Sequence, residues 1–193
     1  MTDPDKPITP DGFQTVPSAF DRLLERRMVF LRGELSDDRA NELVAQLLWL
    51  EGESSDPITM LIDSPGGATH GMLAVHDTMV AMAAPVATHC LGMAASAGAF
   101  LLATGTGRRS AGPNARIMLH QPIGGAQGTA ADVAIIAEEI TSLRRRVDRI
   151  LAEATGQPDE RIHADTDRDF WMSAEQARDY GVLDEVAERG PRP

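Results

Sequence analysis

The stretch Gly92-Met93-Ala94-Ala95-Ser96-Ala97-Gly98-Ala99-Phe100 decides the fold of this chain. It joins an apolar run over residues 86–91 to a second one over 100–103, so we expect a strand to turn into a helix here. Nearly every residue around Ser96 is small, which lets another backbone approach its hydroxyl closely. The first N–H groups of the helix have no partner within it and are available to stabilise an oxyanion. The stretch therefore predicts either an exposed serine nucleophile or an ordinary serine at a tightly packed turn.

Strands and amphipathic helices are expected to alternate on both sides of this stretch. Residues 57–62 form a near-continuous apolar run, which is typical of a strand buried on both faces. The sequence predicts further strands at 28–31, 86–91, 115–119 and 182–183, and helices at 18–24, after Ser36, from about His70, at 130–155, after Pro158 and from Ser173 to Gly181. Residues 106–114 read as a polar connection. This alternation predicts an α/β domain with a mainly parallel sheet.

Three positions with chemical potential each follow one of the expected strands, namely Gly66-Gly67, Ser96 and His120. Because the carboxyl ends of parallel strands lie at one edge of a sheet, we expect them to gather there. Of the five histidines, only His120 directly follows a buried strand and precedes a glycine-rich segment. A serine nucleophile needs a base and a carboxylate that orients the base. The candidates for that carboxylate are Asp165, Asp167 and Asp169, and the pattern does not choose among them.

The helix expected over 130–155 has apolar residues at alternating spacings of three and four, like the seam of a coiled coil. These residues are Val133, Ile136, Ile140, Leu143, Val147 and Ile150. We interpret the helix as one that projects from the domain and meets a partner chain. The alternative is that it packs on its own sheet.

Composition limits the function further. The 193 residues suit one domain, and the net charge of −11 with 4% aromatic residues argues against nucleic-acid binding. Cys90 is the one cysteine and reads as a small buried residue, so no disulfide framework is expected, in keeping with a cytoplasmic protein. The first fifteen residues lack the apolar segment of a leader, and no run is long enough to span a membrane. The histidines lack the spacing of the HExxH zinc motif, so no metal is expected.

Four segments, in order and at the expected spacing, resemble the signature segments of the Clp protease family. They are Ser64-Pro65-Gly66-Gly67, the stretch over 92–100, Met118-Leu119-His120-Gln121-Pro122, and Asp165-Thr166-Asp167-Arg168-Asp169. The resemblance runs from about Ser18 to Val186. It implies a crotonase-like spiral of ββα repeats with a projecting handle over 121–155. Residues 18–188 would form the peptidase domain, after a flexible and processed arm (1–17) and before a disordered tail (189–193).

The resemblance also implies the roles of single residues. Ser96 would be the nucleophile, His120 the general base and then the general acid, and Asp169 the residue that orients His120. The backbone N–H groups of Gly67 and Ala97 would form the oxyanion hole. The substrate backbone would pair with the strand segment 123–128, in particular with Ile123, Gly124 and Gly125.

Members of the family form two stacked seven-membered rings and receive unfolded polypeptides from an AAA+ ATPase. The resemblance thus implies an ATP-dependent serine endopeptidase that needs no cofactor of its own, because the partner uses the ATP. Its subunits would be copies of this chain or paralogues. Two alternatives remain: a non-catalytic ring subunit that assembles with an active paralogue, and another crotonase-fold enzyme that acts on acyl-CoA. Against the second alternative, the sequence shows no basic pocket that would bind the CoA phosphates.

Several positions depart from the family pattern. Thr59 and Leu61 stand where the family carries aromatic residues that receive the docking loops of the ATPase. Arg108-Arg109-Ser110 replaces another aromatic, and the arm lacks the apolar segment that builds the axial pore. These departures indicate a divergent bacterial paralogue that forms mixed rings or uses an altered ATPase interface. We also expect it to be insensitive to small molecules that occupy the usual docking pocket.

Overall fold

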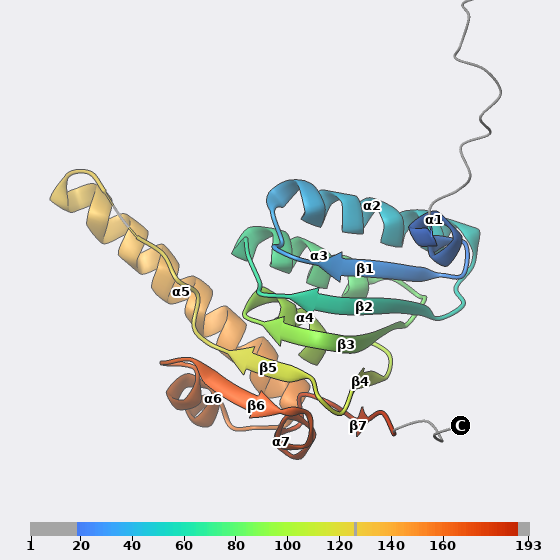
Figure 1. Cartoon of the computed structure of the whole chain (residues 1–193). Helices are drawn as coiled ribbons and strands as arrows, with labels where there is room; N and C mark the ends of the chain where they lie inside the picture. The colour runs from blue at the N-terminus through green and yellow to red at the C-terminus, as the bar shows by residue number, and fades with distance from the viewer. Residues whose placement is uncertain (1–18, 126, 189–193) are drawn as a thin grey trace, which may run out of the picture.

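A computed structural model describes residues 19–125 and 127–188, and within them one mostly parallel sheet of seven strands organises the chain (Figure 1). The expectations for the arm, for Ser18 and for the tail lie outside the described residues. The strands are β1 (Met28–Arg32), β2 (Ile58–Ser64), β3 (Val86–Ala95), β4 (Arg109–Ala111), β5 (Arg116–Leu119), β6 (Phe170–Ser173) and β7 (Glu185–Val186). The helices are α1 (Ala19–Leu24), α2 (Asp37–Glu53), α3 (Thr69–Ala81), α4 (Ala97–Ala103), α5 (Ala130–Thr155), α6 (Asp159–Asp165) and α7 (Ala174–Tyr180). The predicted mixed α/β fold is confirmed.

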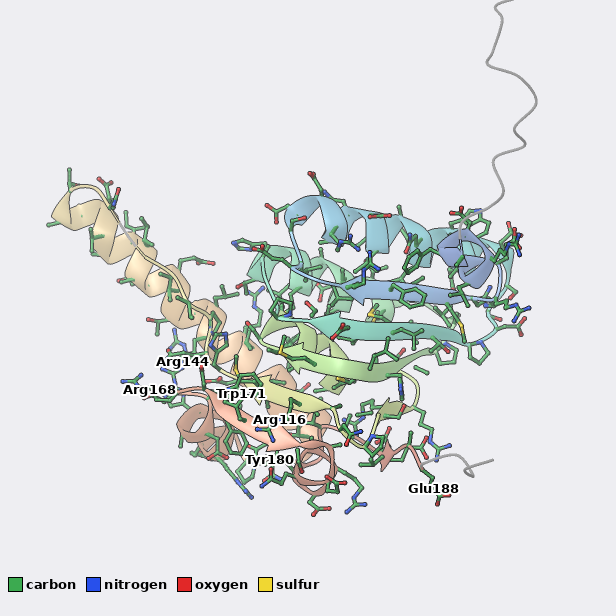
Figure 2. The ribbon with its side chains drawn as sticks, in the orientation of Figure 1. Arg116, Arg144, Arg168, Trp171, Tyr180 and Glu188 are labelled. Carbon is green, nitrogen blue, oxygen red and sulfur yellow. The ribbon has the colours of Figure 1, made fainter. Side chains whose placement is uncertain are left out.

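The long strand β3 is the branch point of the sheet. β1, β2 and β3 lie side by side and parallel. The first half of β3 pairs with β4, which in turn pairs with β7, and its last residues, Met93 to Ala95, pair with β5. Among the strands of the described residues, only β5 and β6 run antiparallel, and Arg116 of β5 lies over the ring of Trp171 of β6 (Figure 2). This branching brings the end of β5, and the loop before β6, next to the end of β3.

The main core lies between the sheet and helices α2, α3 and α4 (Figure 1). In β2, Ile58, Met60 and Ile62 are fully buried, whereas Thr59 and Leu61 on the other face are half-buried. The prediction that this strand is buried on both faces is therefore wrong for the single chain. Its apolar outer residues leave that face of the sheet partly open to solvent.

Helix α5 extends away from the sheet, as Figure 1 shows. Thr129 caps its start in a capping box with Asp132, and Gly156 ends it in the left-handed conformation. Its buried residues, Val147, Asp148, Leu151 and Ala152, all belong to its last three turns. The alternative in which the whole helix packs on its own sheet is therefore excluded, since the first half contacts little of this chain.

The segment around Arg109 differs from the prediction, because it forms strand β4 instead of an irregular connection. The Arg109 guanidinium donates to the carbonyl oxygens of Ala103, Ala154 and Gly181, at the ends of three helices. It also pairs with Asp184, and these hydrogen bonds hold the pKa of that carboxyl below its usual value. A polar side chain thus ties β4 to the ends of α4, α5 and α7.

The last strand also lies elsewhere than expected. The N–H groups of Val182 and Leu183 donate to the Ala177 carbonyl in the turn that ends α7. They are therefore not free to join the sheet. The strand follows instead at Glu185–Val186, which pairs with β4.

Candidate active site

Ser96 sits in a strained turn between β3 and α4. Its φ of 54° and ψ of −121° are unusual for a residue with a side chain. The strain is held by the backbone, because the Ser96 N–H donates to the Met118 carbonyl and its carbonyl accepts from Phe100. The hydroxyl does not cap α4. It is therefore available for contacts outside the turn.

The glycines of the β2–α3 turn pack directly against this serine. Gly66 and Gly67 have φ values of 103° and 152°, which side chains rarely allow. A Cβ on Gly66 would lie 2.6 Å from the Cβ of Ser96, and one on Gly67 would collide with the backbone of Leu35. The buried Ser64 hydroxyl accepts from the Gly66 N–H at 3.1 Å and supports the turn. Only glycines let this loop approach so closely.

Two backbone N–H groups beside Ser96 are left out of the secondary structure. The bridge between Leu35 and Gly67 uses the N–H groups of Leu35 and Ala68, not that of Gly67. Ala97 is the first residue of α4, so its N–H has no intrahelical acceptor. Gly67 and Ala97 line the same small pocket as Ser96. Such a pair of donors can hold a negatively charged oxygen.

His120 follows β5 and faces Ser96. Its Nε2 lies 2.8 Å from the Ser96 Oγ, and its side chain is only 14% exposed. On the other side of the ring, Nδ1 lies 3.3 Å from the Asp169 Oδ1, and the Asp169 side chain is 61% exposed. The structure thus brings Ser96, His120 and Asp169 into one chain of contacts. The contact on the serine side is the shorter one.

The three acidic candidates have different partners in the structure. Asp165 accepts from the Tyr180 hydroxyl at 2.8 Å, and Asp167 accepts from the side chain of Gln121. Asp169 pairs with His120. The residue pattern left this choice open and the family resemblance implied Asp169, which is the one of the three that lies beside His120.

The other histidines lie away from this site. The ring of His76 packs edge-on against Phe100, and burial lowers its pKa. His89, whose pKa burial also lowers, contacts the Ser110 hydroxyl at 2.8 Å, and His163 contacts Asp148. His70 is exposed at the start of α3. In the described part of the chain, no group of three or more acidic, histidine or cysteine side chains is arranged to hold a metal.

An apolar pocket next to Ser96 was not anticipated from the sequence. Its apolar lining comes from four elements, α3, α4, β5 and α5, through Met72, Phe100, Leu119, Val147 and Leu151. Each of these residues is buried, and each fits the helix or strand periodicity of an ordinary core residue. The sequence carried no signal that separates them from the core, because only the fold brings α3 and α5 beside Ser96.

Ile123, Gly124 and Gly125 lie beside an open groove between the start of α3 and helix α5. They are exposed, and Ile123 is 81% exposed. Among the described residues of the segment 121–128, none pairs in a strand with the rest of this chain. The backbone there is accessible to an extended peptide.

Cys90, in the middle of β3, is fully buried. Burial, and to a lesser extent the nearby Asp63, raise the pKa of its thiol to about 12. A thiol that stays protonated is a poor nucleophile. None of the described helices has the length and apolar character needed to cross a membrane.

Comparison with known protein families gives one further finding. The sequence model of the family described as Clp protease matches residues 13–190, which is nearly the whole chain. The residues that the structure gathers around Ser96 lie within the matched range.

Proposed function

This chain belongs to the Clp protease family, and we propose that it is a serine endopeptidase whose triad is Ser96, His120 and Asp169. The observation that carries the proposal is the 2.8 Å contact between the Ser96 Oγ and the His120 Nε2 at a strained turn. A serine held in this way is positioned for proton transfer to the imidazole. The roles of the three residues are those that the family resemblance implies.

In the proposed reaction, the Ser96 Oγ attacks the carbonyl carbon of the scissile bond while His120 takes up the hydroxyl proton. The oxyanion that forms is stabilised by the N–H groups of Gly67 and Ala97. His120 then gives the proton to the leaving amine, and an acyl-enzyme remains on Ser96. A water molecule then attacks the ester while His120 takes one of its protons. His120 gives a proton back to the Ser96 Oγ as the acyl group leaves. Asp169 orients the imidazole and stabilises its charged form.

We propose that the substrate is an extended polypeptide. Its backbone would pair with the accessible segment at Ile123, Gly124 and Gly125, which would explain broad tolerance of sequence. The side chain before the scissile bond would lie against the mouth of the small apolar pocket lined by Met72 and Leu151. Neither contact requires a cofactor.

We further propose that the chain works in two stacked seven-membered rings of itself or of paralogues, fed by an AAA+ ATPase. The support within the chain is the first half of α5, where Val133 and Ile135 are exposed although they are apolar. A projecting helix with such residues needs a partner surface. Enclosed active sites would admit only unfolded chains.

The test compares assembled rings of the wild type with Ser96→Ala, alone and with candidate paralogues and ATPases. We expect Ser96→Ala to abolish hydrolysis of a short fluorogenic peptide and labelling by a fluorophosphonate. Ser110→Ala is the matched control, because Ser110 also contacts a histidine but lies outside the site, and it should keep the label. If wild-type rings show neither hydrolysis nor labelling in any assembly, the proposed catalysis is wrong.

A non-catalytic ring subunit is the second candidate. The observation that favours it is the exposed Asp169, whose contact with His120 is longer than that of Ser96. Mixed rings with an active paralogue separate the two functions. Activity that is unchanged by Ser96→Ala in the mixed ring would support the second candidate.

A further inference from the structure

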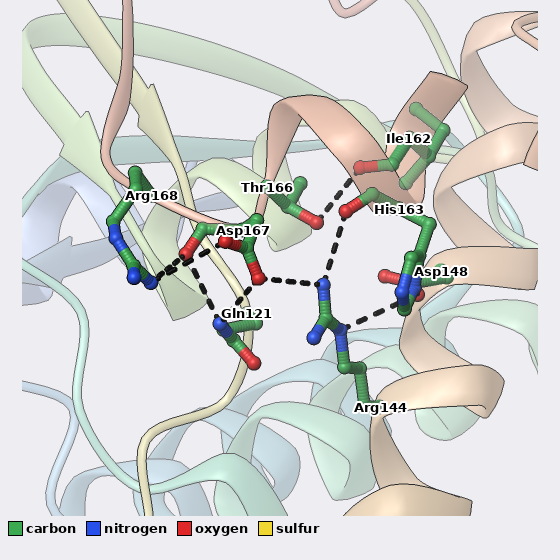
Figure 3. Close-up of polar contacts among 8 residues, drawn as sticks. All are labelled: Gln121, Arg144, Asp148, Ile162, His163, Thr166, Asp167 and Arg168. Carbon is green, nitrogen blue, oxygen red and sulfur yellow. Dashed lines mark hydrogen bonds and ion pairs between the residues drawn. The ribbon is translucent and has the colours of Figure 1, made fainter. Parts of the chain in front are cut away.

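The loop that carries Asp169 is held mainly by the residues before it. Asp169 itself is exposed and pairs with His120. Thr166 and Asp167, by contrast, are attached to the end of β5. The Gln121 N–H donates to the Thr166 carbonyl at 2.8 Å, and the Gln121 side chain donates to the Asp167 carbonyl at 3.0 Å (Figure 3). The position of Asp169 therefore depends on how its neighbours are held.

Arg144 of helix α5 holds the same loop from the other side (Figures 2 and 3). Its Nη2 donates to the His163 carbonyl at 3.0 Å and lies 3.5 Å from the Asp167 carboxylate. One guanidinium thus spans the segment from the end of α6 to the residue two before Asp169. The side chain is only 18% exposed, so solvent screens these contacts less than at an open surface.

Arg144 is itself kept in place by a buried carboxylate. Asp148, one turn further along α5, lies 3.8 Å from the Arg144 Nε and 2.8 Å from the His163 Nδ1. Within the described residues, the Arg144 Nε has no hydrogen-bond partner. The firm hydrogen bond of the guanidinium is therefore the one from Nη2 to the loop, while Asp148 supplies a counter-charge.

We infer that Arg144 is a positioning residue that sets the distance from Asp169 to His120. Helix α5 thereby takes part in building the triad, although it contributes no group to the chemistry. This inference rests on the proposed function, since Asp169 acts on His120 only if the triad operates. It assigns Arg144 no contact with substrate.

The first test replaces Arg144 by methionine, which keeps a long side chain without charge or donors. We expect kcat for a fluorogenic peptide to fall about 10-fold to 10²-fold, as is typical when a reacting group is misplaced by a distant change. KM should stay within about twofold, because Arg144 lines neither the pocket beside Ser96 nor the groove at Ile123. Arg144→Lys should recover part of kcat, because it keeps a charge for Asp167 without the fork of donors. Arg178→Met, which removes an exposed arginine paired with its neighbour Asp179, should leave both constants unchanged.

The second test asks whether Arg144 acts through Asp169. In an Asp169→Asn background, Arg144→Met should cause no further loss of kcat. A loss of the same size in both backgrounds would overturn the inference, as would a wild-type kcat or a loss confined to KM. Native mass spectrometry checks that the variants assemble. If Arg144→Met does not assemble, Arg144→Lys and Gln121→Met replace it in the same cycle; the second removes the side-chain hydrogen bond of Gln121 to Asp167.

A third measurement separates this inference from the proposed function. Hydrogen exchange of a peptide covering residues 163–171 should become faster in Arg144→Met than in the wild type, with α2 unchanged as an internal reference. Unchanged exchange in the loop overturns the inference even if the enzyme is active. If wild-type rings show no peptidase activity while exchange in the loop is faster in Arg144→Met, the proposed function is overturned and Arg144 makes a purely structural contact.

Discussion

The turn at Ser96 and the loop at Asp169 face the same histidine but are built in different ways. The turn is held by backbone hydrogen bonds to β5 and α4, and by glycines that leave no room for a side chain. The loop is held by one backbone hydrogen bond, from Gln121 to Thr166, and otherwise by the long side chains of Gln121 and Arg144 near the surface. The contact of His120 with Ser96 is 2.8 Å, and that with Asp169 is 3.3 Å.

This difference indicates in which part of the site single substitutions can change the geometry by small amounts. Backbone contacts inside a packed sheet change only if the sheet changes, because cores resist displacement. Each side-chain contact near the surface depends on one or two residues. These side chains lose rotamer freedom when the contact forms, which offsets part of its stabilisation. Substitutions that disturb the Ser96 turn should therefore cause large losses of activity, whereas substitutions of the residues that hold the loop should cause partial losses.

The comparison is tested most strongly at the acids of the loop. Asp169→Asn should lower kcat by about 10³-fold or more, since the amide no longer stabilises the charged imidazole in the orientation needed. Asp167→Asn should cost only about tenfold, because it weakens one of the two contacts by which Arg144 positions the loop and keeps the Asp169 carboxylate itself. Steady-state kinetics on assembled rings measures both. An equal or larger loss for Asp167→Asn would show that Asp169 is not the orienting acid.

A second prediction concerns the turn. Gly67→Ala should lower kcat by roughly 10²–10³-fold, because the new Cβ collides with the Leu35 backbone and displaces an oxyanion donor. Gly52→Ala is the control, since the same change near the end of α2 meets no atom within 4 Å and should raise stability by about 0.5–1 kcal/mol. Peptide hydrolysis and thermal unfolding report the two effects. If Gly67→Ala keeps wild-type kcat, its N–H has no catalytic role.

The smallest effect is expected in the strand that supports the turn. Because burial raises the pKa of the Cys90 thiol to about 12, iodoacetamide at pH 8 should neither modify the folded protein nor change its activity. Protein unfolded in guanidinium should be modified in full, which intact mass spectrometry detects. Rapid modification of the folded protein would mean that β3 opens, and that the turn is less rigid than its contacts suggest.

Some features follow from the sequence alone, because they depend on residues a few positions apart. The start of α7 after Ser173 and the bounds of α5 were predictable, since helix starts and helix periodicity are local. That Ser96 and His120 meet was also predictable, because both follow strands whose carboxyl ends share an edge. Strand β4 was not predicted, because the sequence around Arg109 is polar. The Arg109 guanidinium is satisfied by carbonyl oxygens at three helix ends, two of which are distant in the sequence.

The sequence by itself thus determined the order of strands and helices, the α/β class, and the gathering of Gly67, Ser96 and His120. Only the tertiary structure decided which aspartate faces His120, that the backbone of Leu35 excludes a side chain at Gly67, and that Arg144 reaches the loop. The physical reason is the separation along the sequence of the residues that interact. Helices, caps and turns are set by neighbours within about one turn, whereas these contacts join residues far apart in the chain, and no local pattern of side chains records where a distant segment will pack.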